Sequence, residues 1–424
     1  MCPSAKTLTA PVDTTDKSTS AWRSLLHPTV IVAALGYMVD VYDMVLFSLV
    51  RHPSLEALGY HGDAVLEKGV LLINLQMLGM LCGGVFWGML GDKKGRMSVL
   101  FGSILLYSLA NLANAWVTNI HEYGALRFIA GFGLAGELGA AVTLVSEALK
   151  AEHRGLASAI IAAAGAIGSG VSSLVGEFLR WEDAYIFGGI MGLLLLALRL
   201  RSLDSDLFKS LQSSMPQVNR GDLRLLFNRK RAFRYALCVL TGGPVWFVSG
   251  VLIGFAPEIG RSLGVVGDLQ VPAAIFVSTL GYLAGDLINS VLSQRLASRK
   301  KVIVSSVFGC SIFSLWFSLN IDGHPWSYYA LLFALGYSTG YWSLLMTSIA
   351  EQFGTNMRAT VTTTVPNIVR ALVIPMTLGL EVLRPEIGLK HAVEVVGGVV
   401  ICLGAAAAMR LRETYGNSMD FVEA

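Results

Sequence analysis

Charged residues are scarce in this sequence of 424 residues. Asp, Glu, Lys and Arg make up 14% of the chain, whereas soluble globular domains contain about 25%. Hydrophobic residues make up 54%, and the mean hydropathy is +0.60. This balance argues against a water-soluble globular protein and indicates that most of the chain lies in lipid.

Cysteine and histidine are few and scattered. The five cysteines are widely spaced, four of them in apolar runs, and the seven histidines form no cluster. Such spacing predicts neither a disulfide framework nor a metal site. The sequence also lacks a phosphate-binding loop and a nucleophile motif, so we expect no enzyme, no cofactor and no use of ATP. The first 27 residues lack the apolar core of a signal peptide and are expected to form a polar tail.

Twelve apolar runs follow, each about as long as a helix must be to cross the hydrocarbon core. Lipid offers no hydrogen-bond partner to the backbone, and the runs lack the alternation of barrel strands, so each is predicted to be a helix. The expected fold is all-α, with transmembrane helices at 29–50, 69–90, 98–117, 122–148, 155–179, 184–201, 233–255, 272–293, 302–320, 326–350, 360–383 and 390–411.

A polar, basic stretch at 202–231 separates the first six runs from the last six and is typical of an interfacial amphipathic helix. The expected domains are a tail at 1–27, a six-helix bundle at 28–201, this linker, a second bundle at 232–411 and a tail at 412–424. On the side of both termini lie 24 lysines and arginines, against six on the other side and two inside spans. Because basic loops stay in the cytoplasm, we expect both termini there, with the protein in a bacterial inner membrane.

The two halves repeat each other. Glu147 and Arg154 follow the fourth run, and Glu351 and Arg358 follow the tenth, 204 residues later. The loop GMLGDKKGRMSVL after the second run has a degraded counterpart, SVLSQRLASRKKVIV, after the eighth. A repeat of six helices predicts a substrate site at the midplane between the halves.

These motifs resemble those of major facilitator transporters. GDKKGR resembles their loop between the second and third helices, and RFIAGFGLAGELGAAVTLVSEALKAEHRG resembles their fourth helix in the sugar-porter and metabolite:proton symporter branches. VDVYDMVLF in the first run resembles the acidic first helix of the symporters. The resemblance implies that Asp92 and Arg96 hold the cytoplasmic side closed with Glu147 and Arg154. Glu351 and Arg358 are the expected counterparts in the second half, and positive-inside topology with helix capping is the alternative explanation.

Charges inside membrane spans are costly and mark functional sites by default. Asp40 and Asp43 are three residues apart and are expected to share a helix face. The resemblance implies that Asp43 and Arg127 form the pair linked to proton coupling; a structural ion pair is the alternative. Glu137, between Gly136 and Gly139, is either a second proton site or a substrate ligand.

Arg370 offers a planar fork that suits a carboxylate or phosphate, or it neutralises Asp286 or Asp43. Asp286 is either a gate residue or a site residue, with Asn289 on the same face. Pro244 is expected to break the seventh run locally. The candidate substrate-binding residues are Arg370, Asp286, Asn289, Gln76, Trp246, Tyr337, Trp342 and Asn367.

The sequence thus predicts a monomeric secondary transporter in the lipid bilayer that carries a small organic metabolite by alternating access, coupled to protons. A facilitator or antiporter on the same fold is the first alternative, and a non-transporting membrane receptor is the second. No nucleic-acid partner is expected.

Overall fold

A computed structural model describes residues 28–94, 96–139, 141, 151–202, 228–267, 269–319, 324–354 and 357–416, and these ranges contain helices and no strands. The first group of helices comprises α2 (Pro28–Ala57), α3 (Asp63–Lys94), α4 (Arg96–Asn114), α5 (Ile120–Leu134), α7 (Ala151–Phe178) and α8 (Trp181–Ser202). The second group comprises α10 (Arg229–Trp246), the π-helix η2 (Phe247–Ile253), α11 (Ala256–Ser262), α12 (Val271–Arg295), α13 (Arg299–Leu319), α14 (Pro325–Thr339), α15 (Trp342–Gln352), α16 (Arg358–Ala371) and α17 (Val373–Arg410).

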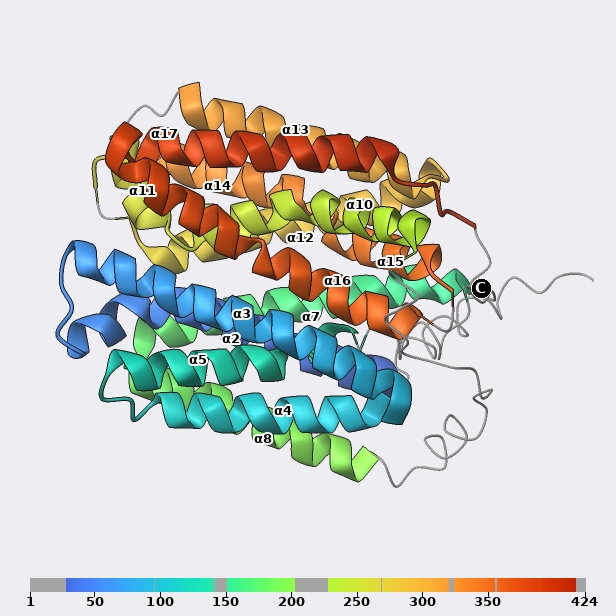
Figure 1. The fold of residues 1–424 in the computed structure, drawn as a ribbon, viewed down its shortest axis with the longest axis horizontal. Coiled ribbons are helices and arrows are strands. Elements are labelled where there is room, and N and C mark those ends of the chain that lie inside the picture. The colour runs from blue at the N-terminus through green and yellow to red at the C-terminus, as the bar shows by residue number, and fades with distance from the viewer. Residues whose placement is uncertain are drawn as a thin grey trace, which may run out of the picture.

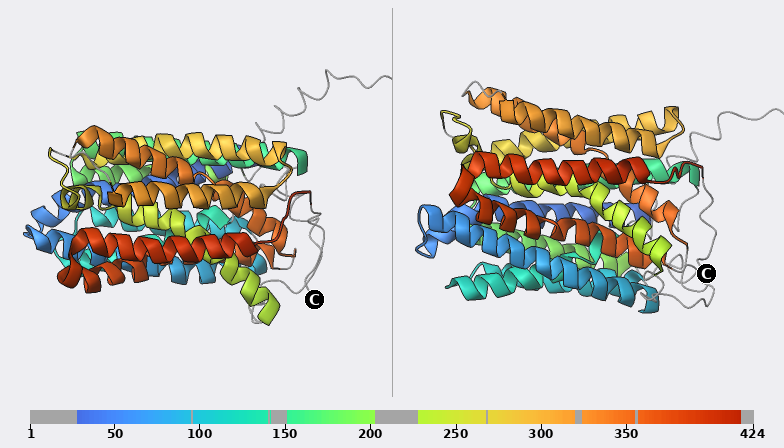
Figure 2. Two further views of the ribbon diagram at one scale, coloured as in Figure 1. Left: turned by 90° about the horizontal axis from the view of Figure 1, so that it is seen from above. Right: turned by 45° about the horizontal axis from the view of Figure 1, so that its top comes forward.

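The two groups of helices lie side by side, and each group is formed by consecutive helices of the chain (Figure 1). Helices α2 to α8 fill one half of the molecule and α10 to α17 the other, and their axes run in one general direction (Figure 2). Helix α3 packs against α16, and α7 packs against α12, so these four helices join the groups. We name the two ends of the bundle the terminus end, where α17 stops at Arg410, and the α11 end opposite it.

The outward faces of the helices are apolar. Leu194 on α8 and Ile312 on α13 are each 65% exposed, and Val382 on α17 is 72% exposed. Six described stretches are long and apolar enough to cross a membrane, the longest being Thr360–Arg410 with 51 residues. That stretch is not one straight helix, because Gly388 has φ 79° and ψ 162° and the chain turns there (Figure 1). A lipid-facing belt of this kind agrees with the composition.

Four of the expected spans are interrupted in the described structure, including the eleventh span at Leu372, and two of these interruptions follow the internal repeat. The fourth span breaks at Ala135 and Gly136, and the tenth breaks at Gly340 and Tyr341. Gly136 and Gly340, one glycine from each break, are 204 residues apart, the same interval that separates Glu147 from Glu351. Span seven carries the interruption predicted at Pro244: α10 ends two residues later and continues as the π-helix η2. Proline removes a backbone donor and disturbs the helical ladder in this way.

Helix packing repeats as well. In the first group, a Cβ atom on Gly83 of α3 would lie 2.3 Å from the carbonyl oxygen of Phe132. In the second group, a Cβ atom on Gly285 of α12 would lie 2.1 Å from the carbonyl oxygen of Tyr337. Glycine at these crossings lets the two backbones touch, as small residues do between membrane helices.

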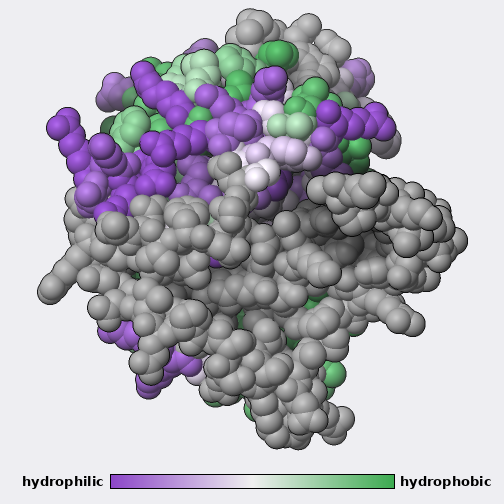
Figure 3. Space-filling model, turned by 90° about the vertical axis from the view of Figure 1, so that its right-hand side faces the viewer, coloured by the Kyte–Doolittle hydropathy of each residue, from purple (hydrophilic) through white to green (hydrophobic). Residues whose placement is uncertain are grey.

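Charge is distributed unevenly between the two ends. Acidic residues occupy the first turns of α3, α5, α8 and α11, all at the α11 end. Basic residues occupy the last turns of α3, α12 and α17 at the terminus end. Hydrophilic side chains gather on that end in Figure 3, over its upper part. The arrangement also suits the helix dipoles, which favour acids at helix N-termini and bases at C-termini.

Candidate functional site

A cavity of about 160 Å³ lies between the two groups of helices. Its walls come from α2, α3 and α7 on one side and from α10, η2, α12, α14 and α15 on the other. Four aromatic side chains contribute, namely Tyr37, Trp246, Tyr282 and Trp342, and no Asp, Glu, Lys or Arg appears among the described lining residues. The Trp246 and Trp342 rings meet edge to face, with centroids 6.4 Å apart. Both tryptophans had been predicted to bind substrate, and their position in the wall suits a planar apolar ring.

A buried ion pair joins the two groups next to this cavity. Arg370 on α16 donates through Nη2 to Asp40 Oδ2 on α2 at 3.0 Å, and both side chains are almost fully buried. The Arg370 guanidinium also lies 5.6 Å from the ring centroid of Trp246, which lines the cavity. The expected partners of Arg370 were Asp286 or Asp43, and the structure corrects this to Asp40. Asp40 Oδ1 and Arg370 Nε form no hydrogen bond with any described residue.

Asp43 has different neighbours from Asp40. It lies inside the first group, where Asn111 of α4 donates to its Oδ1 atom. Arg127 Nη2 of α5 is 4.0 Å from Asp43 Oδ2, and its guanidinium lies over the rings of Phe47 and Tyr185. The structure therefore brings together the two residues that the resemblance pairs. Asp40 and Asp43 were expected to share one face of α2, but they contact different helices. Asp40 contacts Arg370 of α16, whereas Asp43 contacts α4 and α5.

Glu137 forms a buried ion pair of its own within the first group. Arg199 of α8 donates to both carboxylate oxygens, at 3.0 and 2.8 Å, and Ser103 of α4 donates at 2.9 Å. Arg199 is one of the 24 basic residues assigned above to the terminus side, and the structure shows that this residue is buried, with 1% exposure. Glu137 is absent from the described wall of the central cavity. A carboxylate that accepts from two other helices in this way fixes their relative position.

The two asparagines predicted to bind substrate lie at the helix breaks instead. Asn289 of α12 donates to the Gly340 carbonyl at 2.9 Å, and Asn367 of α16 donates to the Ala135 carbonyl at 2.8 Å. A break inside a membrane frees carbonyl groups that need donors, and each asparagine supplies one. Asp286 lies beside the break at Gly340, because a Cβ atom on Gly340 would approach the backbone nitrogen of Asp286 to 2.4 Å.

Gln76 and Tyr337 do not line the described cavity wall either. Gln76 is buried in α3, and a Cβ atom on Gly131 would lie 2.1 Å from its carbonyl oxygen. Tyr337 faces Gly285 through its backbone. The backbones of both residues belong to the close helix crossings, and a role of their side chains in binding substrate stays a prediction.

Comparison with known proteins agrees with this architecture. A family model described as the Major Facilitator Superfamily matches residues 33–374, which is most of the chain. The chain belongs to the Major Facilitator Superfamily. It is therefore a membrane transporter of small organic metabolites and not an enzyme.

Relatives in the superfamily are named for small organic substrates. The chain is 26% identical over 396 residues to a probable 4-methylmuconolactone transporter of Cupriavidus pinatubonensis, with 91% of this chain and 90% of that protein covered. It is 26% identical to the niacin transporter NiaP of Acinetobacter baylyi, covering 78% and 82%. A structure of the proton:xylose symporter XylE bound to 6-bromo-6-deoxy-D-glucose superposes with a TM-score of 0.69 at 15% identity, covering 95% of this chain and 98% of that one. That superposition establishes the all-α fold of the superfamily for this chain.

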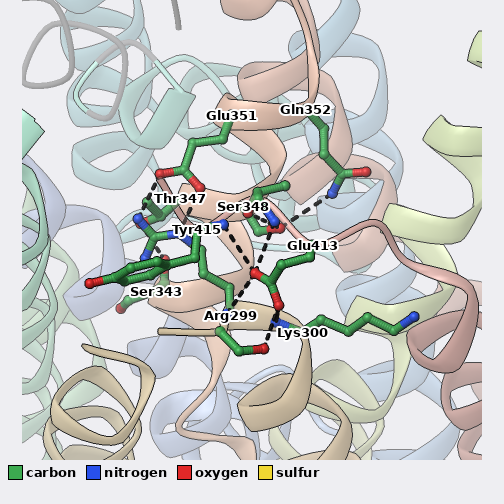
Figure 4. A network of polar contacts seen from close by, with 11 residues as sticks. Arg299, Lys300, Ser343, Thr347, Ser348, Glu351, Gln352, Glu413 and Tyr415 are labelled. Carbon is green, nitrogen blue, oxygen red and sulfur yellow. Dashed lines mark hydrogen bonds and ion pairs between the residues drawn. The ribbon is translucent and has the colours of Figure 1, made fainter. Parts of the chain in front are cut away.

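The second half of this superfamily member has a polar cluster at the terminus end (Figure 4). Arg299, the first residue of α13, donates to both oxygens of Glu351 at 2.6 Å. Arg358 donates through Nε to the Ala350 carbonyl at 3.0 Å. The sequence had paired Glu351 with Arg358 by analogy with the first half. The structure instead pairs Glu351 with Arg299, which comes from the degraded repeat loop. Glu147 and the side chains of Asp92, Arg96 and Arg154 lie outside the described residues.

The C-terminal segment completes that cluster, which the sequence did not predict. Glu413 accepts hydrogen bonds from Ser298 Oγ and from the backbone nitrogens of Arg299 and Lys300, at the start of α13. Thr414 Oγ1 lies 3.2 Å from Ser348 Oγ on α15. The hydropathy of the sequence does not predict that Glu413 lies beside α13, because its position depends on the path of the chain after α17.

A second unpredicted contact closes the α11 end. Arg51 of α2 donates to Glu258 of α11 at 2.6 Å, and His52 lies 3.0 Å from the same carboxylate oxygen. Partial burial of Glu258 raises its pKa, but the hydrogen bond from His52 and the charge of Arg51 outweigh this and lower it to about 2. Arg384 of α17 also reaches Asp63 of α3, at 3.0 Å. Both pairs join the two groups, so this end is held by charges.

Proposed function

We propose that this transporter carries small organic acids with a planar ring, coupled to protons, by alternating access between residues 28–201 and residues 232–411. Both termini face the cytoplasm of a bacterial cell, and the chain works as a monomer in the inner membrane. The basic terminus end and the acidic α11 end support this orientation, because basic segments stay in the cytoplasm.

The observation that carries the substrate class is the Asp40–Arg370 ion pair beside an aromatic cavity. A guanidinium binds carboxylates through two parallel hydrogen bonds, and Arg370 Nε forms none with the described residues. A substrate carboxylate can therefore bind Arg370 in competition with Asp40, while its ring packs between Trp246 and Trp342. Relatives named for niacin, for gentisate and for 3-(3-hydroxy-phenyl)propionate support this class.

Asp43 supports proton coupling. It is a buried acid whose only charged neighbour at ion-pair distance in the described structure is Arg127, at the limit of 4.0 Å. A charged carboxylate is costly at this depth, so small movements between α2 and α5 change the balance between its charged and neutral forms. Helix α2 also lines the substrate cavity, so a movement of α2 that changes the surroundings of Asp43 also changes the cavity, which links the proton to the substrate.

The test is uptake into liposomes that contain the purified protein, with niacin, gentisate and 4-hydroxybenzoate offered in turn. For the wild type, an inward proton gradient should drive accumulation of at least one of these acids. Asp43→Asn imitates the neutral acid, so it should keep counterflow at equal pH and lose accumulation driven by the gradient. Glu394→Gln, on the outer part of α17, should behave like wild type. A wild type that ignores the gradient would replace the symporter by a facilitator or antiporter.

A further inference from the structure

Three buried hydroxyl groups form a continuous chain inside the first group of helices. Ser54 Oγ of α2 is 3.1 Å from Tyr123 Oη of α5, and Tyr123 Oη is 2.6 Å from Tyr185 Oη of α8. All three side chains have 0% exposure. Helix α2 ends three residues after Ser54, and α5 begins three residues before Tyr123, so the chain starts close to the surface at the α11 end.

The inner end of this hydroxyl chain faces the coupling pair. The Tyr185 ring lies 5.8 Å from the guanidinium carbon of Arg127, and Arg127 is 4.0 Å from Asp43. Asp43 Oδ2 and the three Arg127 nitrogens form no hydrogen bond with any described residue, although all are buried. Buried polar atoms of this kind are the ones that ordered water bridges.

The hydroxyl chain is separate from the substrate cavity. Neither its three members nor Asp43 appears among the residues lining the described cavity wall. A solute in the cavity therefore does not block it, and a proton that follows it does not pass through the substrate.

Tyr123 and Tyr185 also differ from three other buried tyrosines. Tyr42, Tyr328 and Tyr341 each donate to a backbone carbonyl, at 2.9, 2.9 and 2.8 Å, which fixes the hydroxyl as a donor. Tyr123 Oη contacts both Ser54 Oγ and Tyr185 Oη, and in each of these contacts either oxygen can be the donor. Ser54 Oγ also lies 3.2 Å from the Arg51 carbonyl, so its hydrogen can point to that carbonyl or to Tyr123. A hydroxyl donates one hydrogen and accepts others, so this chain can reverse its direction.

We propose that Ser54, Tyr123 and Tyr185 form a proton relay between the α11 end and Asp43, with water bridging Tyr185 to the carboxylate. This rests on Asp43 being the coupling acid proposed above. A proton that enters at Ser54 displaces the hydroxyl proton toward Tyr123, and each oxygen passes on its own proton as it accepts the next. The bridging water passes the last proton to Asp43 in the same way, so Asp43 gains one proton and each hydroxyl stays neutral overall. Rotation of the hydroxyls then restores their original hydrogen-bond direction.

The surroundings of Asp43 limit which groups take part. Its titratable and charged neighbours are Asp40 and Tyr42 on α2, Arg127 and Tyr123 on α5, Tyr185 on α8 and Tyr107 on α4. Tyr42 is outside the relay because its hydroxyl donates to the Ala184 carbonyl. Arginine keeps its proton in proteins, so Arg127 holds the carboxylate in place without carrying the transferred proton. The hydroxyl chain is then the described route from Asp43 toward the α11 end.

The experiment compares Tyr123→Phe/Tyr185→Phe with Tyr42→Phe in liposomes. Removing both partners of one hydrogen bond leaves fewer buried groups unpaired than removing one, and Tyr42 is the matched control because it lies between the same helices, α2 and α8. The double variant should slow gradient-driven uptake about tenfold or more, the scale of assisted proton transfer, while counterflow at equal pH stays at the wild-type rate. Tyr42→Phe should leave both rates unchanged.

Gradient-driven uptake by the double variant at the wild-type rate would overturn the relay. So would an equal loss of both rates in a protein whose unfolding temperature matches that of Tyr42→Phe, because a relay affects only the proton-linked step. If the double variant unfolds early, Ser54→Ala provides the same comparison with a smaller change. A wild type with no response to the gradient would instead refute the proposed coupling, and the relay with it.

Discussion

At the scale of single residues, the glycines at the helix crossings decide how close the helices can lie. Gly83 meets the backbone of Phe132, so a methyl group there has no flexible side chain to displace. We expect Gly83→Ala to destabilise the protein by about 1–3 kcal/mol, as overpacking does elsewhere. Gly398 on α17 has no neighbouring atom within 4 Å, so Gly398→Ala should be neutral or stabilising. Thermal unfolding in one detergent measures both, and equal midpoints would contradict this account of the crossings.

Sequence alone locates the buried charges but not their partners. Low hydropathy inside apolar runs identified Asp40, Asp43, Arg127, Glu137 and Arg370, since a charge in a membrane span is conspicuous. Partners cannot be found in this way, because Asp40 and Arg370 are 330 residues apart in the chain. Arg199 was missed because it lies at the edge of its span, where a buried and a solvated arginine have the same sequence context. The Trp246 and Trp342 predictions agree with the cavity wall, whereas Asn289 and Asn367 turn toward backbone carbonyls.

At the scale of elements, the segment after α17 holds the start of α13. Partial burial of Glu413 raises its pKa, but hydrogen bonds from Ser298 and the backbone of Tyr415, Arg299 and Thr414 outweigh this and lower it to about 2. A pKa below its ordinary value of 4.5 means that the charged form is stabilised by folding. The contribution is therefore complete above pH 4.5 and is lost as the pH falls from 4.5 toward 2.

Glu413→Ala should lower the unfolding temperature at pH 7 by roughly 1–3 °C, the scale expected for losing an acceptor at a helix N-terminus. Glu386→Ala, an exposed acid on α17, is the control and should change little. The difference between the two variants should shrink as the pH is lowered below 4.5, and a difference that persists at low pH would show that the carboxylate charge is not responsible. Thermal unfolding of both variants, measured from pH 7 to below pH 4.5, tests this role of the Glu413 carboxylate.

The helix breaks show which interruptions of a helix can be predicted from the sequence and which cannot. Pro244 predicts an interruption in span seven because proline lacks a backbone donor, and the π-helix η2 begins three residues later. The breaks at Gly136 and Gly340 have no proline, and glycine alone is common in membrane helices that continue. They are recognisable in the structure because they recur 204 residues apart and because Asn367 and Asn289 supply the missing donors.

At the scale of the whole molecule, contacts between the two groups occur at the α11 end and around the central cavity. Arg51 and Glu258 meet at the α11 end, Asp40 and Arg370 meet beside the cavity, and Ser169 of α7 meets Thr279 of α12 with 2.8 Å between their oxygens. Ser169 and Thr279 also line the central cavity. A substrate can enter this cavity from one side only when helices on that side separate, which is what alternating access requires.

A disulfide between α7 and α12 tests this requirement directly. Ser169→Cys/Thr279→Cys places two thiols where oxygens already lie in contact, within the range that a disulfide can bridge. Oxidation should abolish both counterflow and gradient-driven uptake, and reduction should restore them, because the link forbids separation of the groups at this face. Each single cysteine variant, treated in the same way, controls for the four described native cysteines, Cys82, Cys238, Cys310 and Cys402. If the linked protein still exchanges substrate at the rate of the reduced protein, α7 and α12 do not part during transport. The moving interface would then have to be the opposite one, between α3 and α16.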